Sequence, residues 1–173
     1  MSLPAPRTPD GPYRVCFVCL GNICRSPMAE VVARARLAEA GLDEAVAVDS
    51  AGTGDWHVGA QMHLPARVEL GRGGYDGEAH RARQVEPSLL GERDLVLAMD
   101  NSNFNTLKSL SRTIPGGSSR IRLFGEVADL DGADIPDPYG GSPAEFARVL
   151  AMIESAMPRL VAQIAEVLRP AAP

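Results

Sequence analysis

The feature that most constrains this chain is an apolar segment that leads into a loop with two cysteines. Residues 13–19 (YRVCFVC) lie between Pro12 and Gly21, which is typical of a buried β-strand. A helix should begin shortly afterwards, because Pro27 suits a first helical position and Ser26 suits the N-cap before it. A strand, a short loop and a helix in this order are the opening unit of an α/β fold.

The same alternation continues along the chain. Strands are expected at 46–52, 95–99 and 121–124, and helices after residue 27, across 104–110 and from 142 onward. The last helix begins with a capping box of Ser142 and Glu145, and Pro158 inside it should kink or split it. We therefore expect a single-domain, doubly wound α/β fold with a four-stranded parallel sheet and helices on both faces. Ligands of such sheets bind beyond the carboxyl ends of the strands, where the Cys19 loop begins.

Composition and charge narrow the range of partners. The 173 residues suffice for one core, and the net charge of -5 with a pI near 5.2 provides no basic footprint for nucleic acid. No apolar run approaches the roughly 20 residues that span a bilayer, so we expect no membrane partner. Residues 1–12 contain four prolines and lack the apolar core of a secretory signal. They are expected to form a disordered leader, and a cytoplasmic location is expected for the chain.

The three cysteines lie close together, at positions 16, 19 and 24. An odd number so tightly spaced does not suit a disulfide framework and favours thiols in a reducing compartment. Cys16 and Cys19 form a C-x-x-C pattern, but the residues between them belong to a strand, and Cys16 alone is best explained as a buried core residue. No histidine or fourth cysteine has the spacing of a zinc site, and no nucleotide-binding glycine motif occurs. We expect neither a metal nor a cofactor.

The loop from Cys19 to Ser26 (CLGNICRS) has the residues of an anion site. Main-chain N–H groups and the start of the helix attract negative charge, Gly21 permits a tight turn, and Arg25 can grip two phosphate oxygens at once. The same environment stabilises a thiolate at Cys19, to which Ser26 can donate a hydrogen bond. A thiolate beside a phosphate cradle is a nucleophile for phosphoryl transfer.

The segment VCFVCLGNICRSPMAE resembles the active-site loop of the low-molecular-weight protein tyrosine phosphatases. Four further segments follow in the order of that family: DSAGT (49–53), HRARQV (80–85), AMDNSN (98–103) and IPDPYG (135–140). The resemblance covers a domain at residues 13–169. It implies a monomeric enzyme that hydrolyses phosphotyrosine in proteins or peptides through a phosphocysteine intermediate, with phosphate as product and inhibitor and without metal.

The resemblance also implies roles for three catalytic residues. Cys19 is expected to be the nucleophile, Arg25 the cation that binds phosphate, and Asp137 the general acid that protonates the leaving phenolate. Position along the chain alone does not single out Asp137, because aspartates at 129, 131 and 134 crowd the same loop.

Further residues are expected to support the loop and to contact the substrate. Asn22, Ser50 and His80 should form a hydrogen-bond network that holds the loop open, whereas Asp100 should cap a helix. An aryl substrate should stack between two aromatic walls above the loop. The expected substrate contacts are Leu20, Gly21, Asn22, Ile23, Cys24, Ser26, Trp56 and Tyr139.

Other activities fit parts of the pattern. A thiol-coupled arsenate reductase needs further cysteines downstream, and none follows Cys24. Phosphoarginine hydrolysis in related enzymes goes with a small polar residue before the second loop cysteine, where this chain has Ile23. A non-catalytic phosphotyrosine-binding module would not need Cys19, Arg25 and Asp137 together.

Two details of the loop region bear on specificity and regulation. Many family members carry a second aromatic residue after the Asp-Pro-Tyr segment, but Gly140 follows Tyr139 here, which leaves the preferred peptide open. Cys24 is expected to intercept oxidised Cys19 as a disulfide and so to protect it from irreversible oxidation. Cys16 should be a poorer partner, because the strand holds it upstream of the loop.

Overall fold

A four-stranded parallel sheet forms the centre of the computed structural model, which describes residues 2–169. The strands lie in the order β2-β1-β3-β4, and every neighbouring pair is parallel, as predicted. The strand bounds are Tyr13–Cys19 for β1, Val46–Gly52 for β2, Leu95–Ala98 for β3 and Ile121–Leu123 for β4. Because all four run the same way, the loops that follow β1, β2 and β3 gather at one edge of the sheet.

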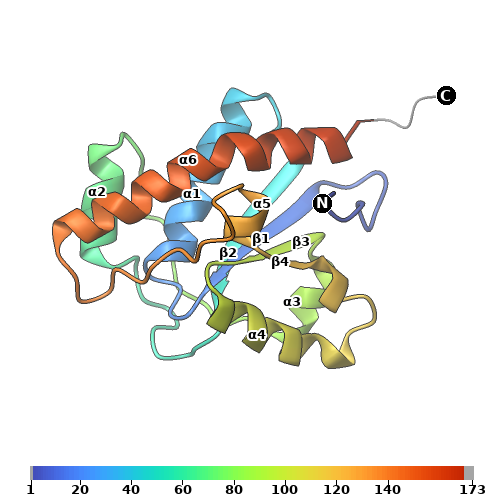
Figure 1. Cartoon of the computed structure of the whole chain (residues 1–173), viewed down its shortest axis with the longest axis horizontal. Coiled ribbons are helices and arrows are strands. Elements are labelled where there is room, and N and C mark those ends of the chain that lie inside the picture. Colours follow the sequence, from blue (N-terminus) through green and yellow to red (C-terminus); the bar gives the residue numbers. More distant parts are fainter. Residues whose placement is uncertain (1, 170–173) are drawn as a thin grey trace.

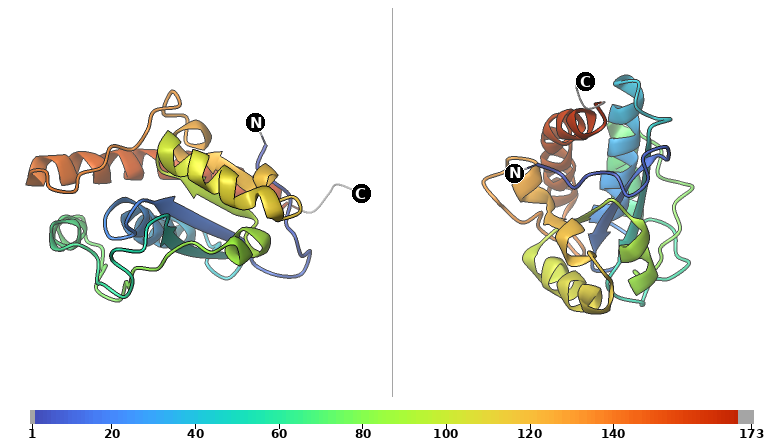
Figure 2. Two further views of the ribbon diagram at one scale, coloured as in Figure 1. Left: turned by 90° about the horizontal axis from the view of Figure 1, so that it is seen from below. Right: turned by 90° about the vertical axis from the view of Figure 1, so that its right-hand side faces the viewer.

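Helices cover both faces of the sheet, which confirms the doubly wound arrangement (Figures 1 and 2). One face carries α1 (Arg25–Glu39), α5 (Phe124–Val127) and α6 (Pro143–Val167), and α2 (Leu64–Arg72) packs beside α6. The other face carries α3 (Pro87–Glu92) and α4 (Asn101–Leu110), and two 3-10 turns lie at Ser111–Thr113 and Ser118–Arg120. Within residues 2–169, no helix is both long and apolar enough to cross a membrane.

Strand β1 distributes its side chains between two cores. Val15 and Phe17 pack into the core under α1 and α6, where the Phe17 ring meets Phe124 edge to face at a centroid distance of 5.4 Å. Cys16 and Val18 face the smaller core under α3 and α4. The strand is therefore apolar at almost every position because both of its faces are buried, as the continuous apolar run indicated.

The helix ends differ from the sequence prediction in two places. Helix α1 begins at Arg25, so Ser26 lies inside its first turn and is not the N-cap. Its side chain instead points at Cys19, and the Ser26 hydroxyl oxygen lies 2.9 Å from the Cys19 sulfur. Helix α6 starts with the predicted Ser142–Glu145 capping box but continues through Pro158 without a break, so the expected split does not occur.

The leader expected to be disordered is held by specific contacts over residues 2–12. The Arg7 main chain donates to Asp94 at 2.6 Å, and its guanidinium donates to two carbonyls at the end of α3. Leu3 is buried in the main core, and the Pro4 carbonyl accepts a hydrogen bond from Tyr13. The prediction of disorder is wrong for these residues, because the leader supplies partners to polar groups at the amino ends of the strands. Residue 1 lies outside the described residues.

Candidate active site

The Cys19 loop, residues 19–25, connects the carboxyl end of β1 to the start of α1. Its main-chain carbonyls turn outward: Cys19 and Leu20 accept from Thr53 and Gly54 at 2.9 Å, and Ile23 accepts from His63 at 2.8 Å. The N–H of Asn22 points inward, at Cys19 Sγ (3.3 Å). Neighbouring segments thus hold the loop by its carbonyl oxygens, which leaves its N–H groups to face an anion.

Close approach of β2 to this loop depends on Gly52. A Cβ atom at that position would lie 2.7 Å from the Leu20 carbonyl oxygen and 3.1 Å from the Asn22 nitrogen. The last residue of β2 must therefore lack a side chain. This contact explains why the strand ends in a glycine here.

Cys19 lies at the base of the loop, and its side chain is almost fully buried. Its sulfur lies 2.9 Å from Ser26 Oγ, in addition to the contact with the Asn22 N–H. Both neighbours can donate hydrogen to sulfur, and donors of this kind favour the thiolate over the thiol. The fully buried Cys16 faces the opposite core, and burial together with nearby Asp49 raises the pKa of its thiol well above the usual value.

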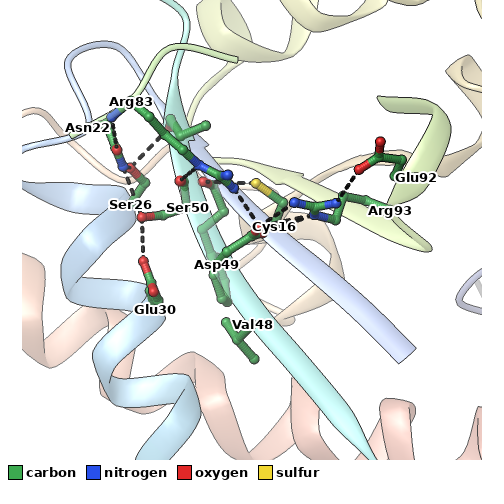
Figure 3. Close-up of polar contacts among 12 residues, drawn as sticks. Cys16, Asn22, Ser26, Glu30, Val48, Asp49, Ser50, Arg83, Glu92 and Arg93 are labelled. Carbon is green, nitrogen blue, oxygen red and sulfur yellow. Dashed lines mark hydrogen bonds and ion pairs between the residues drawn. The ribbon is translucent and has the colours of Figure 1, made fainter. Parts of the chain in front are cut away.

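Asn22 connects the loop to the rest of the molecule, as Figure 3 shows. Its backbone adopts a left-handed conformation (φ 55°), which asparagine tolerates better than most residues. Its Nδ2 donates to Ser26 and to Ser50, both at 2.9 Å, and its Oδ1 accepts from the Arg83 main-chain N–H at 2.9 Å. Every polar atom of the side chain has a partner, so its orientation is fixed.

His80 and Glu30 complete this network. The Nε2 atom of His80 lies 2.7 Å from the Asn22 carbonyl oxygen, so Nε2 must carry the hydrogen. Burial lowers the pKa of His80, although this hydrogen bond and nearby Glu30 act in the opposite direction. The Glu30 carboxylate accepts from the Ser50 hydroxyl at 2.5 Å. The structure thus brings together the three expected supporting residues and adds Glu30, the last residue of the VCFVCLGNICRSPMAE segment, to which the sequence assigned no role.

Arg25 is buried beneath the pocket and is held from the opposite side of the loop. Its Nη1 donates to Asp100 at 2.6 Å and to the Ile135 carbonyl at 2.9 Å, and its Nη2 lies 3.6 Å from Asp137. Burial alone would lower the pKa of Arg25, but Cys19, Asp100 and Asp137 raise it above the usual value. Asp100 is also the N-cap of α4, as predicted, because its side chain accepts a hydrogen bond from the Asn103 N–H. One carboxylate thus caps the start of a helix and orients Arg25.

Asp137 is the member of the acidic loop that reaches the pocket. Its side chain is 45% exposed, lines the pocket wall and accepts a hydrogen bond from the Tyr139 N–H at 3.1 Å. Asp134 instead binds Asn101 at the start of α4. Asp129 and Asp131 occupy left-handed turn positions farther back in the loop. Geometry thus separates four aspartates that the sequence left equivalent without the family resemblance.

A pocket of about 240 Å³ opens above Cys19. Trp56 and Tyr139 lie on its rim, with 70% and 57% of their surfaces exposed, so both rings are accessible for stacking as expected. His57, which the sequence did not indicate, forms part of the wall and faces Tyr139 at a ring distance of 6.1 Å. The walls are otherwise largely apolar, and a flat aromatic group fits between them. The lining residues are Cys19, Leu20, Gly21, Ile23, Cys24, Arg25, Trp56, His57, Asp137 and Tyr139.

The predicted site residues therefore fall into two groups. Most of them line this pocket, whereas Asn22, Ser26, Ser50 and His80 lie behind the loop in the network just described. The family model of the low molecular weight phosphotyrosine protein phosphatases matches residues 14–169.

The chain belongs to this family of hydrolases. A low molecular weight protein-tyrosine-phosphatase of Streptomyces coelicolor is 44% identical over 158 residues, which cover 89% of this chain and 94% of that protein. The structure of a protein tyrosine phosphatase from Entamoeba histolytica is similar with a TM-score of 0.82 at 33% identity, over 88% of this chain and 97% of that one.

One structural neighbour in the same family fold has a different activity. The arginine phosphatase YwlE, in a form with a phosphorylated active-site serine, matches with a TM-score of 0.77 at 26% identity, over 88% of this chain and 96% of its own. Membership of the low molecular weight phosphatases thus identifies the class of hydrolase but not the phosphorylated residue that it acts on. The residues of the pocket wall are the evidence for the substrate.

Proposed function

We propose that this chain hydrolyses phosphotyrosine in proteins or peptides through a phosphocysteine intermediate, without metal. The observation that carries the proposal is the convergence of three side chains on one pocket. Cys19 forms its base, the Arg25 guanidinium lies beneath it, and Asp137 stands on its wall 3.6 Å from that guanidinium. A nucleophile, a phosphate-binding cation and an acid in one pocket are the parts that phosphoryl transfer requires.

The first chemical step follows from this arrangement. The phosphate group enters the Cys19 loop, where main-chain N–H groups and Arg25 balance its charge. The Cys19 thiolate attacks phosphorus, so that the S–P bond forms as the bond from phosphorus to the phenolic oxygen breaks. Asp137, in its acid form, donates a proton to that oxygen and the phenol leaves.

The second step regenerates the enzyme. The Asp137 carboxylate accepts a proton from a water molecule, and the resulting hydroxide attacks phosphorus as the S–P bond breaks. Inorganic phosphate forms and Cys19 returns to the thiolate. Hydrogen bonds from Ser26 and from the Asn22 N–H support the thiolate both as nucleophile and as leaving group.

The dimensions and chemistry of the pocket support an aryl substrate. The nucleophile is buried at the base, so the phosphate must stand on an arm long enough to reach it, and phosphotyrosine has such an arm whereas phosphoserine does not. Ile23, Trp56 and Tyr139 supply apolar and aromatic surface along that arm. The same apolar walls disfavour the polar guanidinium of phosphoarginine, which would lose part of its hydration against Ile23, Trp56 and Tyr139.

Turnover by the purified protein tests this proposal. Peptides that carry phosphotyrosine, phosphoserine or phosphoarginine are compared at equal concentration, with the Cys19→Ser variant as control. We expect phosphotyrosine to be preferred by at least about 100-fold in kcat/KM, a difference of about 3 kcal/mol in transition-state binding. Comparable efficiency on phosphoserine, or a preference for phosphoarginine, would refute the substrate assignment. Activity of Cys19→Ser above a few per cent of wild type would refute the mechanism.

Three further expectations accompany the proposal. A redox-sensitive Cys19 that Cys24 protects is supported by the position of both sulfurs at one pocket. Inorganic phosphate should inhibit competitively, because the product occupies the same cradle. A cytoplasmic location and a monomeric state remain predictions from the sequence.

A further inference from the structure

The mechanism above makes no use of a charged cluster at Asp49, the first residue of the DSAGT segment. Asp49 accepts hydrogen bonds from both Arg83 and Arg93 (Figure 3). Arg93 approaches it through Nε at 3.1 Å and Nη2 at 2.5 Å. The Asp49 and Arg93 side chains are 28% and 13% exposed, so this cluster differs from the solvated surface pairs that contribute little.

The cluster touches the Cys19 loop through the main chain of Arg83. The Arg83 N–H donates to Asn22 Oδ1 at 2.9 Å. Because a main-chain N–H can only donate, it determines which end of the Asn22 amide is the oxygen, and the Nδ2 end must then face Ser26 and Ser50. The Ser26 oxygen accepts from Nδ2, which leaves its own proton for Cys19 Sγ at 2.9 Å.

The position of the Arg83 N–H is set partly by its own side chain. Residues 80–85 form no regular strand, and they join β2 through the isolated bridge between Gly52 and Gln84. The Arg83 side chain folds back along β2, where Nε donates to the Ser50 carbonyl at 2.9 Å and the guanidinium pairs with Asp49. Arg83 is thus held at two points: its main chain by the bridge beside it to β2, and its guanidinium by Ser50 and Asp49.

Ser26 has a second acceptor besides Cys19. Its hydroxyl also lies within hydrogen-bond distance of the Ala51 carbonyl oxygen, at 3.3 Å, which is longer than the 2.9 Å contact with Cys19 Sγ. The hydroxyl has one proton, so the two acceptors compete for it. A small rearrangement of Asn22 would let the single Ser26 proton go to that carbonyl, and Cys19 would lose a donor. A thiolate with one donor fewer is less stable relative to the thiol.

We propose that Asp49 is a positioning residue for the Cys19 loop: it clamps the Arg83 side chain, and the Arg83 N–H then orients Asn22 so that the Ser26 hydroxyl points at Cys19. The proposal rests on the proposed function of Cys19 as nucleophile. Asp49 itself touches no reacting atom, and its effect passes through Arg83, Asn22 and Ser26 in series.

The sign of the effect distinguishes positioning from simple electrostatics. Asp49→Asn removes a negative charge, so Coulomb repulsion alone cannot raise the pH at which the Cys19 thiolate forms. Positioning predicts the opposite, because a misplaced Arg83 costs the thiolate a hydrogen bond. The pH at which Cys19 becomes reactive should therefore rise in Asp49→Asn.

The experiment measures the rate of Cys19 alkylation by iodoacetamide as a function of pH, with the modified cysteine located by mass spectrometry. In Asp49→Asn the midpoint should rise by about one pH unit, which slows alkylation about tenfold on the acid side. Arg83→Gln should shift the midpoint in the same direction, and the double variant should be no worse than the singles because the two act in series. Asp49→Glu should restore most of the wild-type profile.

Asp94→Asn serves as the matched control. Asp94 is a more deeply buried carboxylate that accepts from the main chains of Arg7 and Arg14, at the far end of the sheet. Its substitution should lower the melting temperature and leave the alkylation midpoint unchanged. If Asp49→Asn does not fold, Arg83→Lys gives an equivalent test at a side chain that is 44% exposed. It keeps the positive charge but loses the Nε donation to Ser50, so only positioning predicts a raised midpoint. An unchanged or lowered midpoint in a folded variant would overturn the proposal.

Failure of the proposed function would look different. If alkylation of Cys19 left turnover intact, Cys19 would not be the nucleophile, whatever the position of the midpoint. If alkylation abolished turnover but the midpoint did not rise in Asp49→Asn, the nucleophile would stand and the positioning role of Asp49 would be wrong.

Discussion

At the scale of single residues, Asp137 combines accessibility with a fixed direction. Its Oδ1 is held by the Tyr139 N–H, and its Oδ2 lies toward Arg25 at the pocket wall. Almost half of the side chain remains exposed, so water can reach it for the second step. An acid in this place is needed most when the leaving phenolate is a strong base.

Replacement of this acid should therefore have a substrate-dependent effect. Asp137→Asn should lower kcat on phosphotyrosine by about 100-fold to 10,000-fold, and much less on para-nitrophenyl phosphate, whose phenolate leaves without a proton. Steady-state kinetics on both substrates measures the difference. Asp134→Asn serves as control, because Asp134 contacts Asn101 at the start of α4. It should leave the ratio of the rates on the two substrates unchanged. Equal losses on both substrates in Asp137→Asn would contradict the role of acid.

Cys24 has the properties of a protective partner for Cys19. Burial raises the pKa of Cys24 to about 12, with Cys19 and Asp137 adding to the effect and Arg25 opposing it. At neutral pH it is therefore a thiol and reacts slowly with peroxide, whereas a thiolate at Cys19 reacts first to give a sulfenic acid. The Cys24 thiol can then attack that sulfur, forming a disulfide and releasing water.

Peroxide treatment followed by dithiothreitol tests this protection. Wild type should recover most of its activity, whereas Cys24→Ser should recover little because its Cys19 proceeds to sulfinic acid. Cys16→Ser is the matched control and should behave as wild type, since Cys16 faces the opposite core from Cys19. Equal recovery in wild type and Cys24→Ser, or a disulfide mapped to Cys16, would contradict the proposal.

Three residues at the site had no role assigned from the sequence. His57 and Arg83 reach it across long stretches of chain, whereas Glu30 lies on α1 and contacts the site through Ser50 on β2. Asp100 was expected as a helix cap and is one, but its contact with Arg25 depends on β3 lying next to β1. Such contacts follow from strand order, which a single sequence does not contain.

At the scale of helices and strands, the predictable elements were those with strong patterns. Strands β1 and β3 are nearly continuous apolar runs, and α6 has a capping box and a long apolar face. The sequence did not indicate α2 and α3. Helix α2 buries only Ala66 and Leu70 and exposes Leu64 and Val68, and α3 has just 6 residues, so neither displays a clear apolar stripe.

Pro158 was expected to interrupt α6, and the packing of the helix explains why it does not. The residues on either side, Met157 and Leu160 among them, are buried against the main core, whereas Pro158 itself points to solvent. Tertiary packing outweighs the missing N–H. Pro158→Ala restores one helical hydrogen bond and should raise the free energy of unfolding by about 1–3 kcal/mol.

Urea unfolding measures this change, and Arg159→Ala on the same exposed turn is the control, with an expected effect within about 0.5 kcal/mol. The greater freedom of the unfolded chain without proline offsets part of the gain, by up to about 1 kcal/mol. A Pro158→Ala variant less stable than wild type would show that the proline fits the helix without cost.

At the scale of the whole molecule, function and stability lie at opposite ends of the sheet. The pocket is built at the carboxyl ends of the strands, whereas the leader binds at their amino ends through Asp94, Tyr13 and Arg120. Removal of residues 2–10 would leave buried Asp94 without one donor and would uncover the site of Leu3. Such losses cost about 1–3 kcal/mol each.

The truncated chain should therefore unfold at a lower urea concentration, and its free energy of unfolding should fall by about 2–4 kcal/mol. At urea concentrations below the unfolding transition, its kcat and KM should be unchanged. Arg7→Ala, which keeps the leader but loses two contacts to α3, should lie between truncation and wild type. A change in KM for the truncated chain would contradict the separation of the two ends.

In the proposed mechanism, phosphate passes through a covalent bond to Cys19. A rapid denaturing quench during turnover of para-nitrophenyl phosphate, followed by peptide mapping, detects that bond. We predict a phosphorylated peptide that contains Cys19, present during turnover and lost when the substrate is exhausted. Phosphate on another residue, or rapid turnover with no phosphorylated Cys19 at any quench time, would contradict the mechanism.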